Sequence, residues 1–245
     1  MVFMQQKYTY GALIMLAILL AGCSKSFLEL KPEQATETGK AIRDLPGLQA
    51  AINGVYSLMQ NENYYGRTMP LLPDLRSDNG FISVINSNRY RNQDQYIVTA
   101  NDVYTTDSWN LLYSVVANAN LVIMKGPHIS LLPSATDSIT ARQIIADAYA
   151  VRALVFFDIA RMYAQPYNYT AGATLMGIPL VTITNVDSVQ SPARSNMKDT
   201  YAQIVSDLAT AIRLFEESKS MAFSSGRLNV YSAKALLSRV LLYKE

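Results

Sequence analysis

The stretch Ala148–Tyr167, AYAVRALVFFDIARMYAQPY, decides the fold of this chain of 245 residues. Together with the residues before it, this stretch carries apolar side chains at helical spacing, and Pro166 marks the end of the pattern. The apolar positions are Ala141, Ile144, Ile145, Ala148, Val151, Val155, Phe156, Ile159 and Met162. A stripe of this length predicts a long helix that buries this face and ends before the proline.

Two helices are predicted ahead of this stretch. The first follows Asp44, whose side chain can cap it, and tolerates Pro46 in its first turn. The second begins near Asp107 or Ser108 and ends at Lys125–Pro127, where glycine and proline break the pattern. Both helices carry an apolar stripe that needs a neighbouring helix to cover it.

Two more helices are predicted after the 148–167 stretch. Asn196 can cap the first, with Asp199 placed favourably for the helix dipole. The loop 167–194 that precedes it contains a β-branched run, 178–184, which is expected to be extended. Asn229 can cap the second helix, whose apolar stripe runs to the last residues without a Gly or Pro stop. Such a face needs a cover, so either this helix packs on the earlier helices or the sequence is a piece of a longer protein, and we expect the second.

The predicted helices follow one another in pairs, and this order favours a mainly all-α fold. Helical pairs stack as hairpins, and each pair buries its apolar face on the next. We therefore expect a tetratricopeptide-like α-superhelix of helical hairpins with long irregular loops. No strict repeat period is visible, so the superhelix depends on the pairing and on the family resemblance described below.

The first residues have the layout of a bacterial lipoprotein signal. Lys7 supplies a positive charge, Gly11–Ala21 forms a short apolar core, and Leu20–Cys23 places the single cysteine after two small residues. The apolar run is shorter than the ~20 residues that a membrane-spanning helix needs. We interpret Leu20–Cys23 as a lipobox and Cys23 as the acylated first residue of the mature protein. The alternatives are an ordinary signal peptide with a chance cysteine and a cysteine buried in a protein core.

The lipid anchor sets the expected organisation of the chain. Residues 1–22 are expected to be a lipoprotein signal peptide, 23–40 a polar tether, and 41–245 a helical domain. One acyl chain binds a membrane only marginally, so two or three chains are needed for stable anchoring. With Cys23 acylated, no thiol remains for a disulfide or a metal site, which is compatible with an exported protein.

Composition and motifs exclude several classes of protein. Half of the residues are hydrophobic and 16% are charged, so a large core is expected and global disorder is not. A net charge of +2 without basic blocks argues against nucleic acid as a partner. HExxH, GxSxG, P-loop and GxGxxG motifs are missing, and His128 is the single histidine. Asp74 and Asp78 lack the rigid apolar surroundings that a glycosidase pair needs. We expect no catalysis, no cofactor and no metal.

A series of short motifs along the chain resembles one protein family. In chain order they are LQAAINGVYSLM (48–59), Trp109-x-x-x-Tyr113 with Asn118-Ala119-Asn120, the 148–167 stretch, Gly177-Ile178-Pro179-Leu180, Ala193-Arg194-Ser195 before 200–215, and LNVYSAKALLSRVLLYKE (228–245). This ordered set, together with the lipobox, resembles the SusD/RagB family of outer-membrane nutrient-binding lipoproteins of Bacteroidetes-type bacteria. The motifs cover nearly all of the chain after Cys23.

The resemblance implies a fold, a location and a partner. Family members are superhelices of tetratricopeptide-like hairpins, held at the cell surface by a lipid anchor in the outer membrane. They cover a SusC-like TonB-dependent transporter like a lid and supply it with glycans or peptides. The resemblance therefore implies capture of oligosaccharides. The alternatives are a RagB-like peptide-binding protein of the same architecture and a tetratricopeptide-like periplasmic scaffold.

The polar stretch 61–106 is expected to be a long irregular loop that carries the ligand site. The chain has 16 Tyr against 7 Phe, and tyrosines in this loop alternate with Arg, Asp and Asn. A sugar needs a flat ring for its pyranose face and planar polar groups for its hydroxyls, and this mixture supplies both. The candidate ligand-binding residues are Tyr64, Tyr65, Arg67, Asp74, Arg76, Asp78, Asn79 and Tyr90.

Two polar residues on the helix stripes are expected to be structural. Arg152 falls on the buried face of the long helix, so its guanidinium needs an acceptor, and Asp158 and Asp207 are the candidates. Asn120 lies on the packed face of another helix and is expected to bond to a loop backbone.

Overall fold

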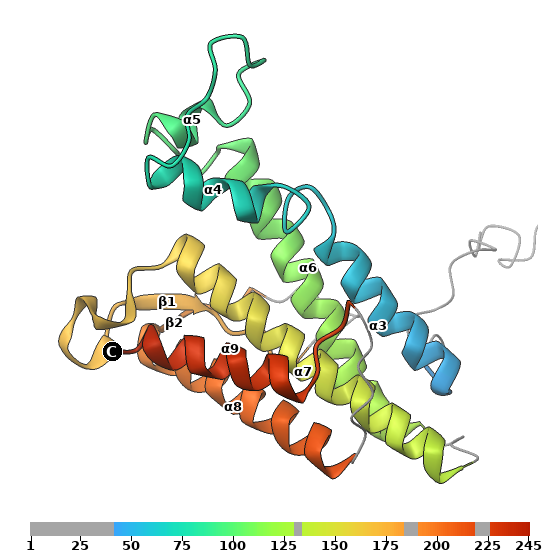
Figure 1. The fold of residues 1–245 in the computed structure, drawn as a ribbon. Helices are drawn as coiled ribbons and strands as arrows, with labels where there is room; N and C mark the ends of the chain where they lie inside the picture. The colour runs from blue at the N-terminus through green and yellow to red at the C-terminus, as the bar shows by residue number, and fades with distance from the viewer. Residues whose placement is uncertain (1–41, 130–133, 184–190, 219–225) are drawn as a thin grey trace, which may run out of the picture. The chain divides into compact units, whose positions relative to one another are not determined.

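The 148–167 stretch forms most of α7, Ala135–Tyr163, in the computed structural model of the chain (Figure 1). The structure describes residues 42–129, 134–183, 191–218 and 226–245. Ser134 caps α7, because its Oγ accepts a hydrogen bond of 3.1 Å from the backbone N of Asp137. The helix therefore begins ahead of the apolar stripe, in turns that are mostly exposed. It ends before Pro166, as predicted.

The predicted N-caps of three other helices are confirmed. Asp44, Asn196 and Asn229 each accept a hydrogen bond of 2.7 to 3.1 Å from a backbone amide of the following turn. These short polar side chains satisfy amides that have no partner within the helix. The helices that follow are α3 (Leu45–Met59), α8 (Met197–Glu217) and α9 (Val230–Leu242).

The predicted start of the second helix, at Asp107 or Ser108, is too late. The helix is α6, Val103–Lys125, and Asp102 caps it by accepting a hydrogen bond of 3.1 Å from the backbone N of Thr105. Its first turn consists of β-branched and aromatic residues, which are weak helix formers, so the pattern alone did not reveal it.

The prediction that the whole of 61–106 is irregular is wrong, because this stretch contains α4, Thr68–Arg76, and the short α5, Arg91–Asp94. The two prolines in α4 argue against a helix when the sequence is considered alone. Pro70 lies in the first turn, where an intrahelical donor is not required, but Pro73 lies inside the helix. Burial of apolar side chains on one side of α4 offsets the hydrogen bond lost there.

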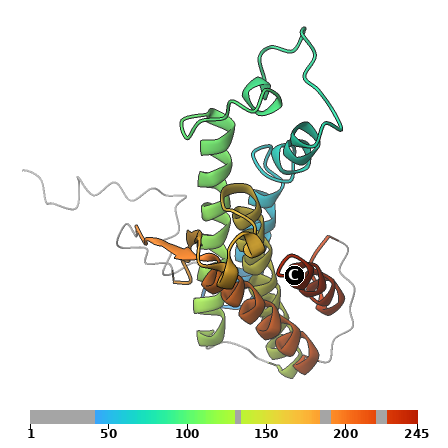
Figure 2. The ribbon, with the colours of Figure 1, turned by 90° about the vertical axis from the view of Figure 1, so that its left-hand side faces the viewer.

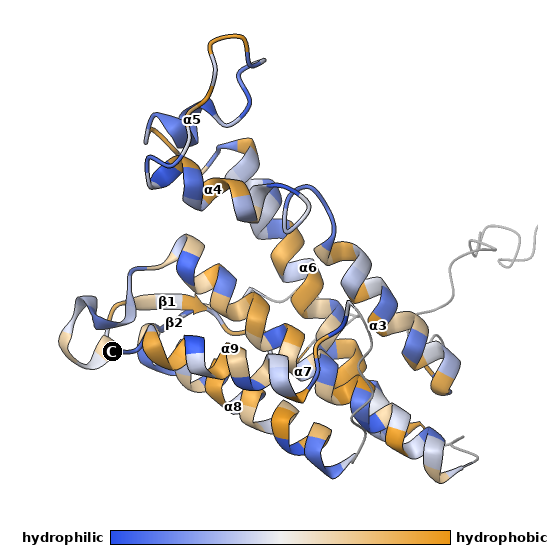
Figure 3. Ribbon diagram, in the orientation of Figure 1, coloured by the Kyte–Doolittle hydropathy of each residue, from blue (hydrophilic) through white to orange (hydrophobic). Residues whose placement is uncertain are grey.

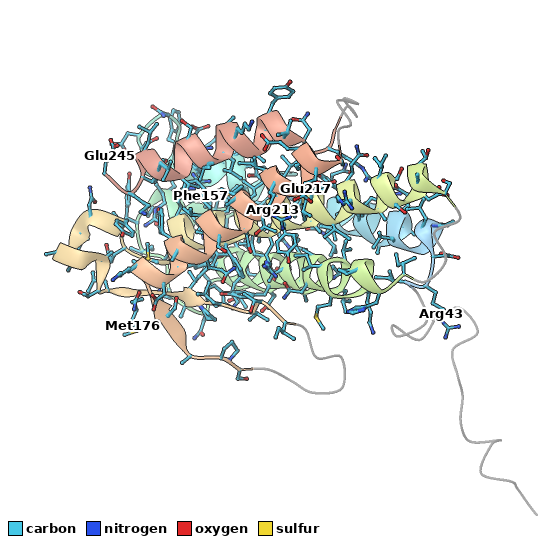
Figure 4. All side chains as sticks on the ribbon, turned by 90° about the horizontal axis from the view of Figure 1, so that it is seen from below. Arg43, Phe157, Met176, Arg213, Glu217 and Glu245 are labelled. Carbon is cyan, nitrogen blue, oxygen red and sulfur yellow. The ribbon has the colours of Figure 1, made fainter. Side chains whose placement is uncertain are left out.

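The helices pack in chain order around α6 and α7 (Figures 1 and 2). α3 lies against α6, α6 and α8 lie against α7, and α9 lies against α8. Their apolar faces meet in one core that includes Phe156, Ile159 and Leu208, and hydrophilic residues, blue in Figure 3, alternate with hydrophobic ones along each helix. On the outer face of α8, Arg213 and Glu217 form an exposed ion pair of 2.7 Å (Figure 4). The prediction of a mainly all-α fold is confirmed.

A small antiparallel sheet follows α7. β1, Met176–Pro179, pairs with β2, Arg194–Asn196, and Met176 lies opposite Asn196. The predicted extended run 178–184 therefore forms a strand only at its start, and its last residue lies outside the described residues. β2 was not predicted, because a strand of this length leaves no alternating pattern to detect.

Side chains from the helices and from β2 hold the segment 176–182 in its extended form. Tyr113, Asn120 and Arg194 donate hydrogen bonds of 2.7 to 2.9 Å to its carbonyl oxygens. The prediction that Asn120 bonds to a loop backbone is confirmed. At Gly177 a Cβ atom would lie 2.1 Å from a hydroxyl oxygen on α8, so the close approach of sheet and helix requires glycine.

A buried ion pair joins α7 to α8. Arg152 donates to both carboxylate oxygens of Asp207, at 2.7 and 2.6 Å. The same guanidinium donates to Asn120 Oδ1 at 2.8 Å and to the carbonyl oxygen of Thr182 at 3.1 Å. Of the two partners predicted for Arg152, Asp207 is therefore the observed one and Asp158 is not. The bidentate geometry and the extra acceptors satisfy both buried charges.

The predicted signal peptide 1–22, the lipobox with Cys23 and the tether 23–40 lie outside the described residues. The division of the chain into these segments and a domain over 41–245 stays a prediction. Within the part that the structure describes, no helix combines the length and the apolar character that a bilayer crossing needs.

Candidate functional site

A pocket of about 420 Å³ lies at the C-terminal end of α7. α4 forms one side, the last turn of α7 and the residues after it form another, and the start of α8 with Tyr243 completes the wall. Arg76, Gln93 and Arg161 are among its polar side chains, and the described residues that line it include no carboxylate. Its volume is in the range of small-molecule sites, ~300–1,000 Å³.

Aromatic rings stand in fixed positions along this wall. Tyr201 and Tyr243 both meet the buried ring of Phe157 edge-on, with centroids 6.1 and 5.1 Å away. The Arg161 guanidinium lies over the same ring, 4.8 Å from its centroid. Burial raises the pKa of the Tyr201 hydroxyl to about 12, so the hydroxyl remains a neutral donor. Rings with polar tips suit a ligand that has both apolar faces and hydroxyl groups.

Beside the pocket, Asp158 on α7 is fully buried and accepts hydrogen bonds from three side chains. Tyr64 Oη and Tyr65 Oη donate to its Oδ2, at 2.6 and 2.8 Å, and Arg161 donates to its Oδ1. Burial, and next the charge of Asp158, raises the pKa of both tyrosines, so both remain protonated donors at neutral pH. These bonds tie the segment ahead of α4 to α7 and so position α4 over the pocket.

Two buried polar atoms at the pocket have no hydrogen-bond partner among the described residues. They are Oε1 of Gln93 and Nε of Arg161, and both residues line the pocket. Gln93 is only 3% exposed, and its Nε2 donates to Asp102 at 2.6 Å, which holds the amide in place. An unpaired buried donor or acceptor costs ~1–3 kcal/mol. A bound ligand with hydroxyl groups offers a donor and an acceptor that can reduce this cost.

The structure separates the predicted ligand-binding residues into two groups, of which the first makes its contacts within the chain. Tyr64 and Tyr90 are buried, so their rings present no face to a ligand in this structure. Tyr65 is 41% exposed, but its hydroxyl is bonded to the buried carboxylate on α7. Arg67 donates to Tyr90 Oη at 3.0 Å and pairs with Glu62 at 2.9 Å. These four residues stabilise the segment around α4.

The second group, Asp74, Arg76, Asp78 and Asn79, is exposed at the end of α4. Tyr96 Oη donates to the carbonyl oxygen of Arg76 and to Asp78 Oδ1, both at 3.1 Å, and so defines the turn after the helix. Arg76 is the predicted residue that the structure brings to the pocket. A ligand-binding role for either group stays a prediction.

The sequence pattern missed most of the pocket. Gln93, Arg161, Tyr201 and Tyr243 come from four separate segments and meet only through the fold. Arg161 and Tyr201 lie within strong helical patterns, which explain the helix and conceal a second role. The excess of tyrosine was the one signal in the sequence that pointed toward this wall.

The pocket offers hydrogen-bond donors, acceptors and aromatic faces, which are the groups that reversible binding requires. Among the described residues, no group of His, Cys, Asp or Glu side chains could hold a metal ion.

The helical-hairpin fold defines the structural class of this protein, and comparison with known proteins identifies the family. The chain belongs to the SusD-like family, described as starch-binding and associating with the outer membrane, whose model matches residues 26–242. The resemblance noted in the motifs is confirmed.

Individual relatives agree with this assignment. SusD-like protein P2 of Formosa agariphila is 24% identical over 94% of this chain and 42% of its own length. A solved SusD superfamily protein of Bacteroides thetaiotaomicron has a TM-score of 0.70 and 30% identity, over 82% of this chain and 43% of that one. Another, from Bacteroides vulgatus, has a TM-score of 0.69 and 26% identity, over 82% and 44%. The chain thus spans about two fifths of the length of these relatives. The likeness confirms the predicted tetratricopeptide-like helical fold.

Proposed function

We propose that this protein is a cell-surface lipoprotein that binds oligosaccharides and delivers them to a SusC-like TonB-dependent transporter in the outer membrane. The observation that carries the proposal is the pocket at the end of α7. Tyrosine rings line it, and an unpaired acceptor on Gln93 and an unpaired donor on Arg161 lie at its wall. The family description, starch-binding and associating with the outer membrane, supports the same ligand class.

The chemistry of the pocket supports a sugar as the ligand. Each sugar hydroxyl can donate one hydrogen bond and accept others, so one hydroxyl-rich ligand can serve both Gln93 and Arg161. The C–H faces of a pyranose ring suit the aromatic wall that includes Tyr201 and Tyr243. Such binding requires shape, stacking and hydrogen bonds, and we propose capture without catalysis.

The outer-membrane location in this proposal depends on Cys23. Acylation of its thiol and amino group would supply the two or three chains that stable anchoring needs. Metabolic labelling with palmitate tests this directly: the native protein is expected to incorporate label, and Cys23→Ser is expected to lose it. A native protein without label would contradict the anchor.

Calorimetric titration with starch-derived and other oligosaccharides tests the ligand. Arg76→Ala is expected to weaken binding about tenfold, because a charged hydrogen bond contributes ~1.5–3 kcal/mol. The matched control is Arg213→Ala, which removes an exposed arginine on α8 that does not line the pocket. Its affinity and the melting temperatures of both variants are expected to stay close to those of the parent chain.

The same calorimetric titration decides between oligosaccharides and peptides as the ligand class. Binding of peptides without binding of any oligosaccharide would overturn the proposal in favour of the RagB-like alternative. Equal affinities in Arg76→Ala and Arg213→Ala would place the site away from the pocket.

A further inference from the structure

The most exposed apolar side chains of the described residues share one loop tip between α4 and α5. Phe81, Val84 and Ile85 are 84%, 100% and 91% exposed. The tip extends past the N-terminal end of α6, and its apolar residues stand out against polar flanks (Figures 1 and 3). Single exposed apolar residues are ordinary, but a cluster of large ones marks a surface that is covered in use.

Specific polar contacts hold the tip in this form. The backbone N of Ile82 donates to Asp94 Oδ1 at 3.1 Å, which fastens the loop to α5. Asn86 Nδ2 donates to the carbonyl oxygen of Arg89 at 2.8 Å, which closes the neck of the tip. The loop is therefore a defined structure that presents its apolar side chains to the outside.

The charged residues of the tip itself are both cationic. The segment 79–93 contains Arg89 and Arg91 and no acidic residue, and Asp78 and Asp94 flank it. Both arginines are exposed, and Arg91 donates to the neutral Asn88 Oδ1 at 3.3 Å. Asp94 accepts from the loop backbone. The tip thus combines an apolar end with two exposed arginines.

We infer that this tip, residues 81–91, inserts into the surface of an anionic lipid bilayer, as a contact separate from any lipid on Cys23. The inference rests on the outer-membrane location proposed above and not on ligand capture. Apolar side chains enter the boundary of headgroups and acyl chains by ~5–10 Å, while arginines remain at the anionic headgroups. A bilayer accepts such a tip without any matching surface.

The size of the tip argues against a stable protein interface. Such an interface buries ~800 Å² on each partner and draws on ~20–30 residues a side. The tip offers three large apolar side chains, Phe81, Val84 and Ile85, on a narrow loop. This area suffices for insertion into a bilayer surface, since burial of each apolar side chain is favourable and requires no matching partner surface.

The test places an environment-sensitive ring at the tip of the full chain. Val84→Trp is mixed with vesicles of phosphatidylcholine, with and without phosphatidylglycerol, and Met176→Trp on β1 is the matched exposed control. Gly11–Ala21 or an acylated Cys23 can bind the chain to vesicles without the tip. The fluorescence signal must therefore report on the tip itself. The emission is therefore read as the difference from the parent chain, which contains Trp109.

On vesicles with phosphatidylglycerol, the emission of Val84→Trp is expected to shift to shorter wavelength and to be quenched by lipids brominated on their acyl chains. Met176→Trp is expected to show neither effect. Replacing Arg89 or Arg91 by Gln is expected to raise the lipid concentration at half-maximal shift about fivefold for each arginine. Phe81→Ser together with Ile85→Ser is expected to reduce the shift at every lipid concentration.

An unchanged emission of Val84→Trp on vesicles that bind the chain would overturn the inference. Equal shifts at both tryptophan positions would overturn it too, because they indicate adsorption of the whole surface. Cross-linking of the tip to an envelope protein instead of lipid would also overturn the inference. A chain that fails these tests and still binds oligosaccharide leaves the proposed function intact, so the two failures are distinguishable.

Discussion

Two buried clusters on α7, roughly two turns apart, combine arginine with aspartate but differ in what they leave open. Arg152 and Asp207 satisfy each other through two hydrogen bonds, and the remaining donors of Arg152 meet neighbouring oxygens. Asp158 accepts from two tyrosines and from Arg161. In this second cluster, Nε of Arg161 has no partner among the described residues.

The difference follows from what surrounds each cluster. The Arg152 cluster lies in the middle of the molecule, where α6 and α8 cover α7 and supply acceptors on several sides. The Asp158 cluster lies at the end of α7, beside the pocket. A closed cluster can only join helices, whereas the open one joins them and leaves a polar atom without a partner among the described residues. Ion pairs of the same composition can thus have different roles in one helix.

The largest expected effect tests the closed cluster. Arg152→Ala is expected to lower the free energy of unfolding by about 3–5 kcal/mol, because it leaves the Asp207 carboxylate buried without its cation. Denaturant titration followed by circular dichroism measures the change. Arg213→Ala, which breaks an exposed pair with Glu217, is the matched control and is expected to cost less than about 1 kcal/mol. Similar costs for both variants would contradict the distinction between buried and exposed pairs.

The next effect tests the open cluster. Asp158→Asn is expected to cost about 2–3 kcal/mol, because the hydrogen bonds from Tyr64 and Tyr65 lose their charged acceptor and Arg161 loses its counterion. Oligosaccharide binding is expected to weaken as well, since these bonds position α4. Asp107→Asn, at an exposed position of α6, is expected to change stability by no more than about 0.5 kcal/mol. Lower stability with unchanged binding would separate this cluster from the ligand site.

A third buried carboxylate, Asp147 on α7, sharpens the comparison, because its cation is farther away. Asp147 Oδ1 accepts from Tyr56 Oη at 2.6 Å, while Nη1 of Arg227 lies 3.9 Å from Oδ2. Burial raises the pKa of Asp147 from 3.8 to about 7, and the hydrogen bond from Tyr56 and the charge of Arg227 only partly oppose this.

The last expected effect is gradual: the stability of the chain depends on pH. Between about pH 4 and about pH 7 the folded chain retains a proton on Asp147 that the unfolded chain has released. Its contribution to stability is therefore full below this window and is lost as the pH rises through it, at no more than about 1.4 kcal/mol per pH unit. Asp147→Asn is expected to remove this slope and Asp107→Asn to keep it. A slope that survives in Asp147→Asn would assign it to another group.

The helices could be predicted because local signals define them. Asp44, Asn196 and Asn229 cap amides only two or three residues away, and the apolar stripes repeat within a few positions. α4 could not be predicted, since its two prolines argue against a helix, and the burial of Met69 and Leu75 that offsets them is decided by packing. A local pattern carries no information about that packing.

The candidate site could be predicted only at Arg76, which was expected to bind ligand and does line the pocket. Tyr64 and Tyr90 were expected to present their rings and are buried instead. Whether a tyrosine faces water depends on the segment that covers it. Here Tyr64 is bonded to Asp158, a residue far along the chain, and the sequence offers no sign of that pairing.

By itself, the sequence determined the five long helices, the caps of α3, α8 and α9, the buried faces and the family, because each of these depends on residues close together or on ordered motifs. Only the tertiary structure decided that Arg152 pairs with Asp207, that Asp158 anchors the tyrosine pair, and that a pocket lies beside it. The physical reason is that partner choice between distant segments is made by packing. Several carboxylates can serve one arginine chemically, and the fold brings one of them within reach.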